Sequence, residues 1–226
     1  MLNWRGMELT SLIAQGLLSW VLFIPLLTFH EFAHAWTAWK CGDDTAYLQG
    51  RVSLNPIVHM EVIGTVVLPL IAIFASLTGS ALAGFIIGWG RPVPVNLRNL
   101  SNPKLQDSLI AMAGPAMNLL LAALLFGLVK IGILTNQEGL IEIARRMILV
   151  SLILCFFNLI PVPPLDGSHI LLHVTGMSYE TYFRLAQAGM IIIIVLLQLP
   201  FVRLALNFVT MATYYLFAHM WGLGGG

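Results

Sequence analysis

The longest apolar run of the chain begins near Leu9 and continues to about Trp39. A helix crosses the roughly 30 Å core of a bilayer with about 20 apolar residues. This run is longer, so it predicts a membrane helix over 9–40 that is tilted or that extends its last turns into a cavity. It has no small-residue cleavage site behind a short apolar core, so we expect the helix to be kept in the mature protein.

The rest of the chain is also too apolar for a soluble domain. Of its 226 residues, 58% are hydrophobic and only 9% are charged, which indicates a multi-pass membrane protein. The formal net charge is +1, and no basic block is dense enough to bind nucleic acid. We therefore predict one all-α, multi-pass membrane domain over 1–226, with transmembrane helices over 9–40, 105–134 and 139–160 and a C-terminal transmembrane region over 186–220.

Two stretches do not fit a simple helix bundle. The apolar segment 62–89 is interrupted by Pro69 and by SLTGS at 76–80, so it predicts either a full span or a re-entrant pair of half-helices. The residues 47–54 alternate in polarity, which favours a short strand or β-hairpin lying against the membrane domain. The expected fold is thus a helical bundle with a re-entrant or β-hairpin element near its functional site.

The end of the first apolar run carries the sequence HEFAH, which places His30, Glu31 and His34 where polar groups are costly. Residues i and i+4 of a helix lie about 40° apart around the axis and about 6 Å along it, so both imidazoles can reach one metal ion. Glu31 lies beside that pair, where it can take a proton from a water without being a ligand. HExxH metalloproteases divide the work in this way. The alternative is a pair of histidines that are hydrogen-bonded in a bundle, with Glu31 paired to one of them.

A catalytic zinc needs a third protein ligand. Asp166 in FNLIPVPPLDGSH is the leading candidate, because prolines open the chain before it and Gly167 lets the backbone turn the carboxylate inward. Two other interpretations stay open. Asp166 could cap the helix that follows it, or His169 or His173 could supply the ligand instead.

Three stretches, HEFAH, AGPAMN and FNLIPVPPLDG, occur in this order in apolar surroundings. Together they resemble the site-2 protease family of intramembrane zinc metalloproteases, peptidase family M50, and the sequence between them resembles its small prokaryotic branch without a PDZ domain.

The resemblance implies that one Zn²⁺ per chain is bound by His30, His34 and Asp166. It also implies that Glu31 activates a water and that Asn158 holds the substrate backbone or the developing oxyanion. From the residues alone, an asparagine in a membrane helix more often bonds a neighbouring helix. The sequence HMEV departs from the family pattern, which has an aspartate and a proline there, but it lies outside the metal motif.

The expected metal site constrains the topology. One ion can bind both the end of the first helix and Asp166 only if the two reach the same side of the membrane. This requires the segment 62–89 to enter and leave on one side, with a bend at 78–80. The same arrangement gathers five basic residues on one face, which the positive-inside rule makes cytoplasmic: Lys40, Arg51, Arg91, Arg98 and Lys104.

The predicted activity is hydrolysis of a peptide bond within or next to a transmembrane segment of another membrane protein. We expect the chain in a prokaryotic cell membrane, with its site toward the cytoplasm. The stretch RPVPV at 91–95 offers a strand edge that could pair with an unwound substrate. The expected partners are therefore the lipid bilayer and a membrane-spanning protein. Two alternatives use the same ligands, namely a membrane zinc transporter or sensor, which has no need of Glu31 as a base, and a zinc hydrolase acting on a non-peptide substrate.

Overall fold

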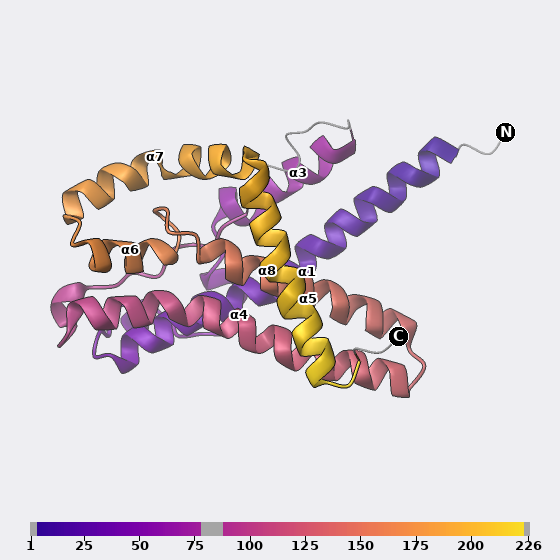
Figure 1. Ribbon diagram of the computed structural model, residues 1–226, viewed down its shortest axis with the longest axis horizontal. Coiled ribbons are helices and arrows are strands. Elements are labelled where there is room, and N and C mark those ends of the chain that lie inside the picture. The colour runs from indigo at the N-terminus through magenta and orange to yellow at the C-terminus, as the bar shows by residue number, and fades with distance from the viewer. Residues whose placement is uncertain (1–3, 78–87, 224–226) are drawn as a thin grey trace.

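The computed structural model describes residues 4–77 and 88–223, and this part of the chain is helical without a β-sheet. Figure 1 shows long helices that cross one another at the centre of the molecule. In chain order the helices are α1 (Trp4–Lys40), α2 (Thr45–Leu48), α3 (Leu68–Leu77), α4 (Pro103–Leu134), α5 (Glu138–Asn158), α6 (Gly167–Thr175), α7 (Tyr179–Gln198) and α8 (Pro200–Met220). Shorter helical turns lie between α2 and α4: η1 (Pro56–Val58), η2 (Val62–Val67) and η4 (Leu97–Asn99).

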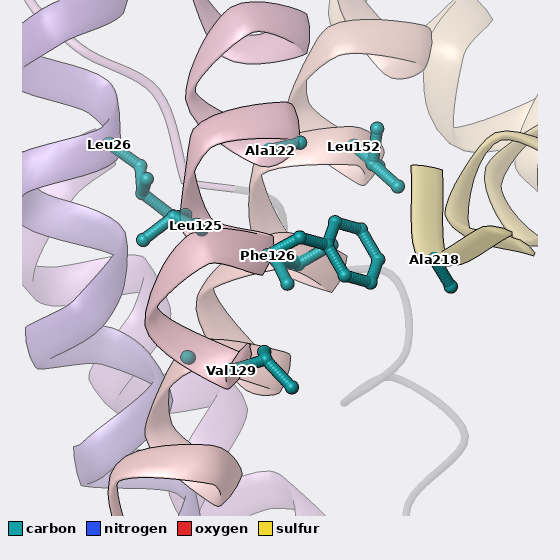
Figure 2. Packing of buried hydrophobic residues seen from close by; sticks show 9 residues of the cluster. Leu26, Ala122, Leu125, Phe126, Val129, Leu152 and Ala218 are labelled. Atoms are coloured by element: carbon teal, nitrogen blue, oxygen red, sulfur yellow. The ribbon is translucent and has the colours of Figure 1, made fainter. Parts of the chain in front are cut away.

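The core of the bundle lies where α1, α4, α5 and α8 meet. Leu26 of α1, Phe126 of α4, Leu152 of α5 and Ala218 of α8 belong to one buried cluster, which Figure 2 shows from close by. In a bilayer such contacts stabilise through close van der Waals packing, because lipid is as apolar as the side chains that leave it. The cluster fixes α1 one turn before His30, and so it also fixes the polar residues that follow.

Four helices in the described part of the chain are long and apolar enough to cross a membrane: Thr10–Lys40 within α1, then α4, α7 and α8. Helix α5 is not among them, because Glu142, Arg145 and Arg146 lie in its first half. Large apolar side chains such as Leu124 and Phe208 are exposed on the isolated chain, as a lipid-facing surface requires. These features agree with a multi-pass membrane protein.

Two helices begin earlier than the apolar pattern predicts, because a capping residue precedes each of them. Helix α4 begins at Pro103 rather than at 105, because the side chain of Asn102 accepts a main-chain N–H and proline suits the first helical position. Helix α7 begins at Tyr179 rather than at 186, because the hydroxyl of Ser178 accepts a main-chain N–H in the same way. Helix α7 ends at Gln198, and Pro200 opens α8.

The residues 47–54 do not form the predicted strand or β-hairpin. Helix α2 covers the start of this stretch, and it is followed by a turn in which Gly50 has φ of 70°. The reason lies just before it. The carboxylate of Asp43 accepts hydrogen bonds from both the main-chain N–H and the hydroxyl of Thr45, and such a side-chain turn favours a helical start over an extended one.

The segment 62–89 is described at its two ends. It begins with η2 and continues as α3, and the bend predicted at 78–80 lies outside the described residues. At its far end Trp89 donates its main-chain N–H to Gly64, and Gly90 forms an isolated antiparallel β-bridge with Met60. The two ends of the segment therefore lie side by side.

Candidate metal centre

Two helix-borne imidazoles and one loop carboxylate meet at a single point. The Nε2 atoms of His30 and His34 lie 3.1 Å apart, and Oδ2 of Asp166 lies 3.2 Å from the first and 3.4 Å from the second. These atoms form a nearly equilateral triangle. A tetrahedral ion with bonds of about 2.0 Å to its ligands has ligand-to-ligand edges of about 3.3 Å. The triangle therefore has the size of one face of a tetrahedral metal site.

Helix α1 presents the two imidazoles from adjacent turns. Their rings lie edge to face, with centroids 4.6 Å apart and planes at 85°. Both residues are buried, at 3% and 7% exposure. Nδ1 of His34 lies 2.7 Å from the carbonyl oxygen of Ile110 on α4, so its proton is held there and Nε2 is left to act as a ligand.

Asp166 reaches the same point because the chain turns sharply after the end of α5. The backbone of Gly167 lies so close to this turn that a Cβ would stand 2.2 Å from the carbonyl oxygen of Leu159. The glycine is thus needed for close approach. Asp166 occupies the N-cap position of α6, yet its side chain makes no capping hydrogen bond. Its buried Oδ2 faces the two imidazole nitrogens without a hydrogen bond of good geometry, which suits a ligand atom better than a cap.

The two histidines that were alternative ligands lie elsewhere. Nδ1 of His169 and Nε2 of His173 approach Oδ2 of Asp107 on α4, at 2.9 Å and 2.6 Å. Both imidazoles are occupied by this carboxylate. Of the candidates for the third ligand, the structure brings only Asp166 into the triangle.

Helix α4 passes directly behind the two imidazoles of α1. The side-chain amide of Asn118, which is fully buried, lies 3.0 Å from Nδ1 of His30. A ligating imidazole carries its proton on the other nitrogen, and the amide can accept that proton when its oxygen faces the ring. Gly114 lies between these contacts, and a Cβ there would stand 2.3 Å from Nε2 of His34. The stretch AGPAMN thus carries both a glycine that lies against the imidazoles and a polar contact to His30.

Glu31 lies on the side of the site that faces the segment after residue 88. It is 8% exposed, and a Cβ on Gly90 would stand 2.9 Å from its Oε1, so this segment passes closely over the carboxylate. Gly90 is held in place by its bridge to Met60 and by the bond from Arg91 to the carbonyl of His59, at 2.8 Å. The predicted base therefore lies beside the ligands, with a fixed backbone opposite it.

A buried arginine supports this segment from behind. Arg51 is 3% exposed and donates to the carbonyl oxygens of Arg91 and Pro92. Burial lowers the pKa of Arg51, and the opposite charge of Glu31 acts against that shift. The guanidinium remains charged because the usual pKa of arginine is above 12. It therefore provides a positive charge behind the segment that faces Glu31.

Asn158 lies at the end of α5 and lines the same cavity as the ligands. Its Nδ2 donates to the carbonyl oxygen of Leu154, one turn earlier in the helix, at 2.8 Å. The predicted contact with substrate therefore requires the amide to share or leave that bond. The described residues bring Asn158 to the cavity wall and not into contact with the metal ligands.

The site opens into one cavity of about 930 Å³. Its walls come from α1, the segment 88–98, α4, the end of α5 and, on the far side, Tyr182, Phe183 and Met190 of α7. Helix α7 comes close to the loop before Asp166, because a Cβ on Gly189 would stand 1.9 Å from a carbonyl oxygen there. The cavity is large enough for several residues of an extended peptide.

Comparison with known proteins identifies the family. The model of peptidase family M50 matches residues 130–199, which contain Asp166 but not HEFAH. "Putative zinc metalloprotease YwhC" of Bacillus subtilis (strain 168) is 37% identical over 188 residues, covering 80% of each chain. "Putative zinc metalloprotease Rip2" of Mycolicibacterium smegmatis is 32% identical over 183 residues, covering 77% of this chain and 64% of the relative. No solved structure gives a significant match. The chain therefore belongs to peptidase family M50, the site-2 protease family, and is a metalloprotease.

Proposed function

We propose that the chain is a zinc-dependent intramembrane endopeptidase that hydrolyses a peptide bond within or next to a transmembrane segment of another membrane protein. The observation that carries this proposal is the triangle of His30, His34 and Asp166, built at the end of an apolar helix with Glu31 beside it. A soluble protease would have no reason to place such a group in a helix that is long and apolar enough to cross a bilayer.

The ligand set supports zinc, one ion per chain. Two imidazoles and one carboxylate are a common ligand set of catalytic zinc, which keeps its fourth position open. The relatives named above carry zinc in their names. The buried, unpartnered Oδ2 of Asp166 supports a cation at this point, because a metal ligand is one of the few roles that explain such an atom. When bound, zinc supplies a Lewis acid that activates water and polarises the scissile carbonyl.

The protein groups around the ion divide the remaining work. Glu31 takes a proton from the attacking water and passes it to the leaving amine, which suits a carboxylate held beside the ligands without ligating. Asn158 offers its Nδ2–H from the cavity wall to the substrate backbone or to the oxygen that gains negative charge. His34 donates its Nδ1 proton to the carbonyl oxygen of Ile110, so the neutral ring presents Nε2 as the ligand atom.

The segment 91–95 supports a peptide substrate. Each residue before a proline is restricted to extended conformations, so Pro92 and Pro94 keep the chain extended. The prolines have no N–H, and those of Val93 and Val95 make no main-chain hydrogen bond in the described part of the chain. Two donors spaced by two residues point to one side of an extended segment. An unwound substrate can pair with this edge, which lines the cavity.

The topology that we propose places the site toward the cytoplasm of a cell membrane. The segment 62–89 would enter and leave on one side as a re-entrant hairpin, which is supported by the contact of its two ends at the bridge between Met60 and Gly90. The positive-inside rule makes that side cytoplasmic. Cysteines at Lys104 and Asn136, at opposite ends of α4, test this in intact cells. A reagent that cannot cross the membrane should label only the second, and labelling of the first from outside would contradict the orientation.

Metal analysis combined with a cleavage assay tests the activity. The purified chain is incubated with a panel of membrane-spanning peptides, and Glu31→Gln is compared with Glu142→Gln, which changes an exposed carboxylate far from the site. We expect one zinc per chain in all three proteins, and cleavage by the wild type and Glu142→Gln only. Retained cleavage by Glu31→Gln would defeat the mechanism. Zinc without cleavage of any peptide by the wild type would favour a transporter, a sensor or a non-peptide substrate.

A further inference from the structure

A second buried polar cluster lies beside the metal centre and has no part in the chemistry above. Asp107 of α4 accepts hydrogen bonds from His169 and His173, one turn apart on α6. Both imidazoles meet the same carboxylate oxygen, Oδ2, and Asp107 is only 4% exposed. The cluster therefore joins two helices through one buried carboxylate.

The cluster is not arranged as a second metal site. Ligands of a tetrahedral ion lie about 3.3 Å apart and face a common point that the ion occupies. Here the nitrogens of His169 and His173 lie 2.9 Å and 2.6 Å from Oδ2 of Asp107, so this oxygen itself occupies the point on which they converge. The contacts are hydrogen bonds, and their mechanical effect is to bind α6 to α4.

Binding α6 to α4 also fixes Asp166. The main-chain N–H of His169 donates to the carbonyl oxygen of Asp166 at 3.1 Å, so the histidine and the metal ligand belong to one rigid turn. On its other side the turn is held by the contact of Gly167 with Leu159. A displacement of His169 from Asp107 would therefore move the carboxylate of Asp166 relative to the imidazoles of α1.

The same helix already positions the other two ligands. The carbonyl of Ile110 binds Nδ1 of His34, and the amide of Asn118 lies against Nδ1 of His30. Together with Asp107 and Gly114 these residues recur every three or four positions, which places them along one face of α4. One face of α4 thus contacts both imidazoles of α1 directly. Through His169 and His173, the same face also contacts α6, which follows Asp166.

We propose that Asp107 is a positioning residue for the metal centre, which fixes Asp166 as the third ligand by holding His169 and His173 against α4. The inference rests on the proposed zinc site. Mutation of a group that orients metal ligands without binding the metal lowers metal affinity by about 10–100-fold. Loss of Asp107 should therefore weaken zinc binding by a factor in that range.

Zinc affinity, measured on the full chain in detergent by competition with a chromogenic chelator, tests the proposal without reference to activity. We expect Asp107→Ala to bind zinc about 10–100-fold more weakly than the wild type. Asp43→Asn is the matched control. Asp43 is also a fully buried carboxylate with several hydrogen bonds, but its partners Thr45, Asn96 and Asn99 make no contact with a ligand. This control should lose stability and keep the affinity of the wild type.

A spectroscopic readout separates positioning from general destabilisation. Co²⁺ replaces zinc in such sites, and its visible absorption depends on the number and arrangement of its ligands. If Asp107 acts through Asp166, the Co²⁺ spectrum of Asp107→Ala should change in the same direction as that of Asp166→Ala. Asp43→Asn should give the spectrum of the wild type.

The outcomes are distinct. Wild-type affinity and an unchanged spectrum in Asp107→Ala would overturn the inference and leave the zinc site intact. Absence of zinc binding by the wild type would instead defeat the proposed function. If Asp107→Ala does not fold, His169→Leu and His173→Leu each remove one of the two hydrogen bonds, and wild-type affinity in both would overturn the inference equally.

Discussion

Gly114 faces the ligand atom of His34 at a distance that leaves no room for a side chain. A Cβ on this glycine would lie 2.3 Å from Nε2 of His34 and 2.6 Å from Cε1 of His30. Real Cβ atoms essentially never approach a neighbour so closely, and a shift of the imidazoles away from α4 would break their contacts with Ile110 and Asn118. The absence of a side chain at position 114 is therefore a condition for the proposed metal site.

Gly114→Ala should abolish metal binding while the helices persist. The added methyl group has to displace the imidazoles from their common point, whereas alanine is a better helix former than glycine. Gly139→Ala is the control, because a Cβ there meets nothing within 4 Å. Metal analysis after purification should find zinc in Gly139→Ala and none in Gly114→Ala. Equal zinc content in the two variants would show that the site tolerates a methyl group.

Removal of the metal should lower the thermal stability of the wild type but not that of Asp166→Ala. A ligand that binds only the folded state stabilises it by about 4 kcal/mol when present at a thousand times its Kd. Asp166→Ala lacks the third ligand, so it has little bound metal to lose. Unfolding temperatures with and without a strong chelator measure the difference. A chelator-induced shift of the same size in both proteins would argue against Asp166 as a ligand.

Asn158→Ala should reduce catalysis without releasing the metal. The amide lines the cavity but does not touch the ligands, and loss of one donor to a developing negative charge costs about 10²–10³-fold in kcat. Its loss also removes the bond to the carbonyl of Leu154, which lies in a helix and keeps its main-chain partner. Steady-state kinetics together with metal content checks this. An unchanged kcat would assign Asn158 to helix packing alone.

Asp43 should make folding sensitive to acid. Burial alone would raise its pKa, but hydrogen bonds from Thr45, Asn96 and Asn99 outweigh this and hold the pKa of Asp43 below its usual value. A carboxyl group with a lowered pKa contributes stability that is fully present above about pH 4 and is lost as the pH falls through the folded value.

Asp43→Asn removes that contribution, at a cost of about 1–3 kcal/mol near neutral pH. The difference in unfolding temperature between the variant and the wild type should narrow as the pH is lowered from 7 toward 3. A difference that is independent of pH would mean that the charge of Asp43 does not matter to the fold.

The proposed metal ligands could be found from the sequence because their geometry is local. His30 and His34 meet through the geometry of any helix, and no tertiary information is needed to place them together. Asp166 required more, namely that a carboxylate after a proline-rich break is the group most able to turn inward. The structure places this carboxylate beside both imidazoles, and its side chain makes no capping bond to α6.

The residues that hold the ligands in place were not accessible in the same way. Nothing in the sequence places Asp107 next to His169, because the two are 62 positions apart and meet only when α6 packs on α4. The strand predicted over 47–54 was wrong for a related reason. The hydrogen bonds that the carboxylate of Asp43 accepts from Thr45 outweighed the alternating pattern.

Helix α1 is one continuous element from Trp4 to Lys40, and it carries both a stretch long and apolar enough to cross a membrane and the two imidazoles of the proposed metal site. A site at a fixed position on such a helix has a fixed depth in the membrane, because its depth changes only when the whole helix moves. The depth of a peptide bond in the membrane would then decide whether it is cut. A target segment would be cut where its backbone stands level with the ion, and lengthening or shortening the flank that anchors the target should slide the cut along it by the same number of residues.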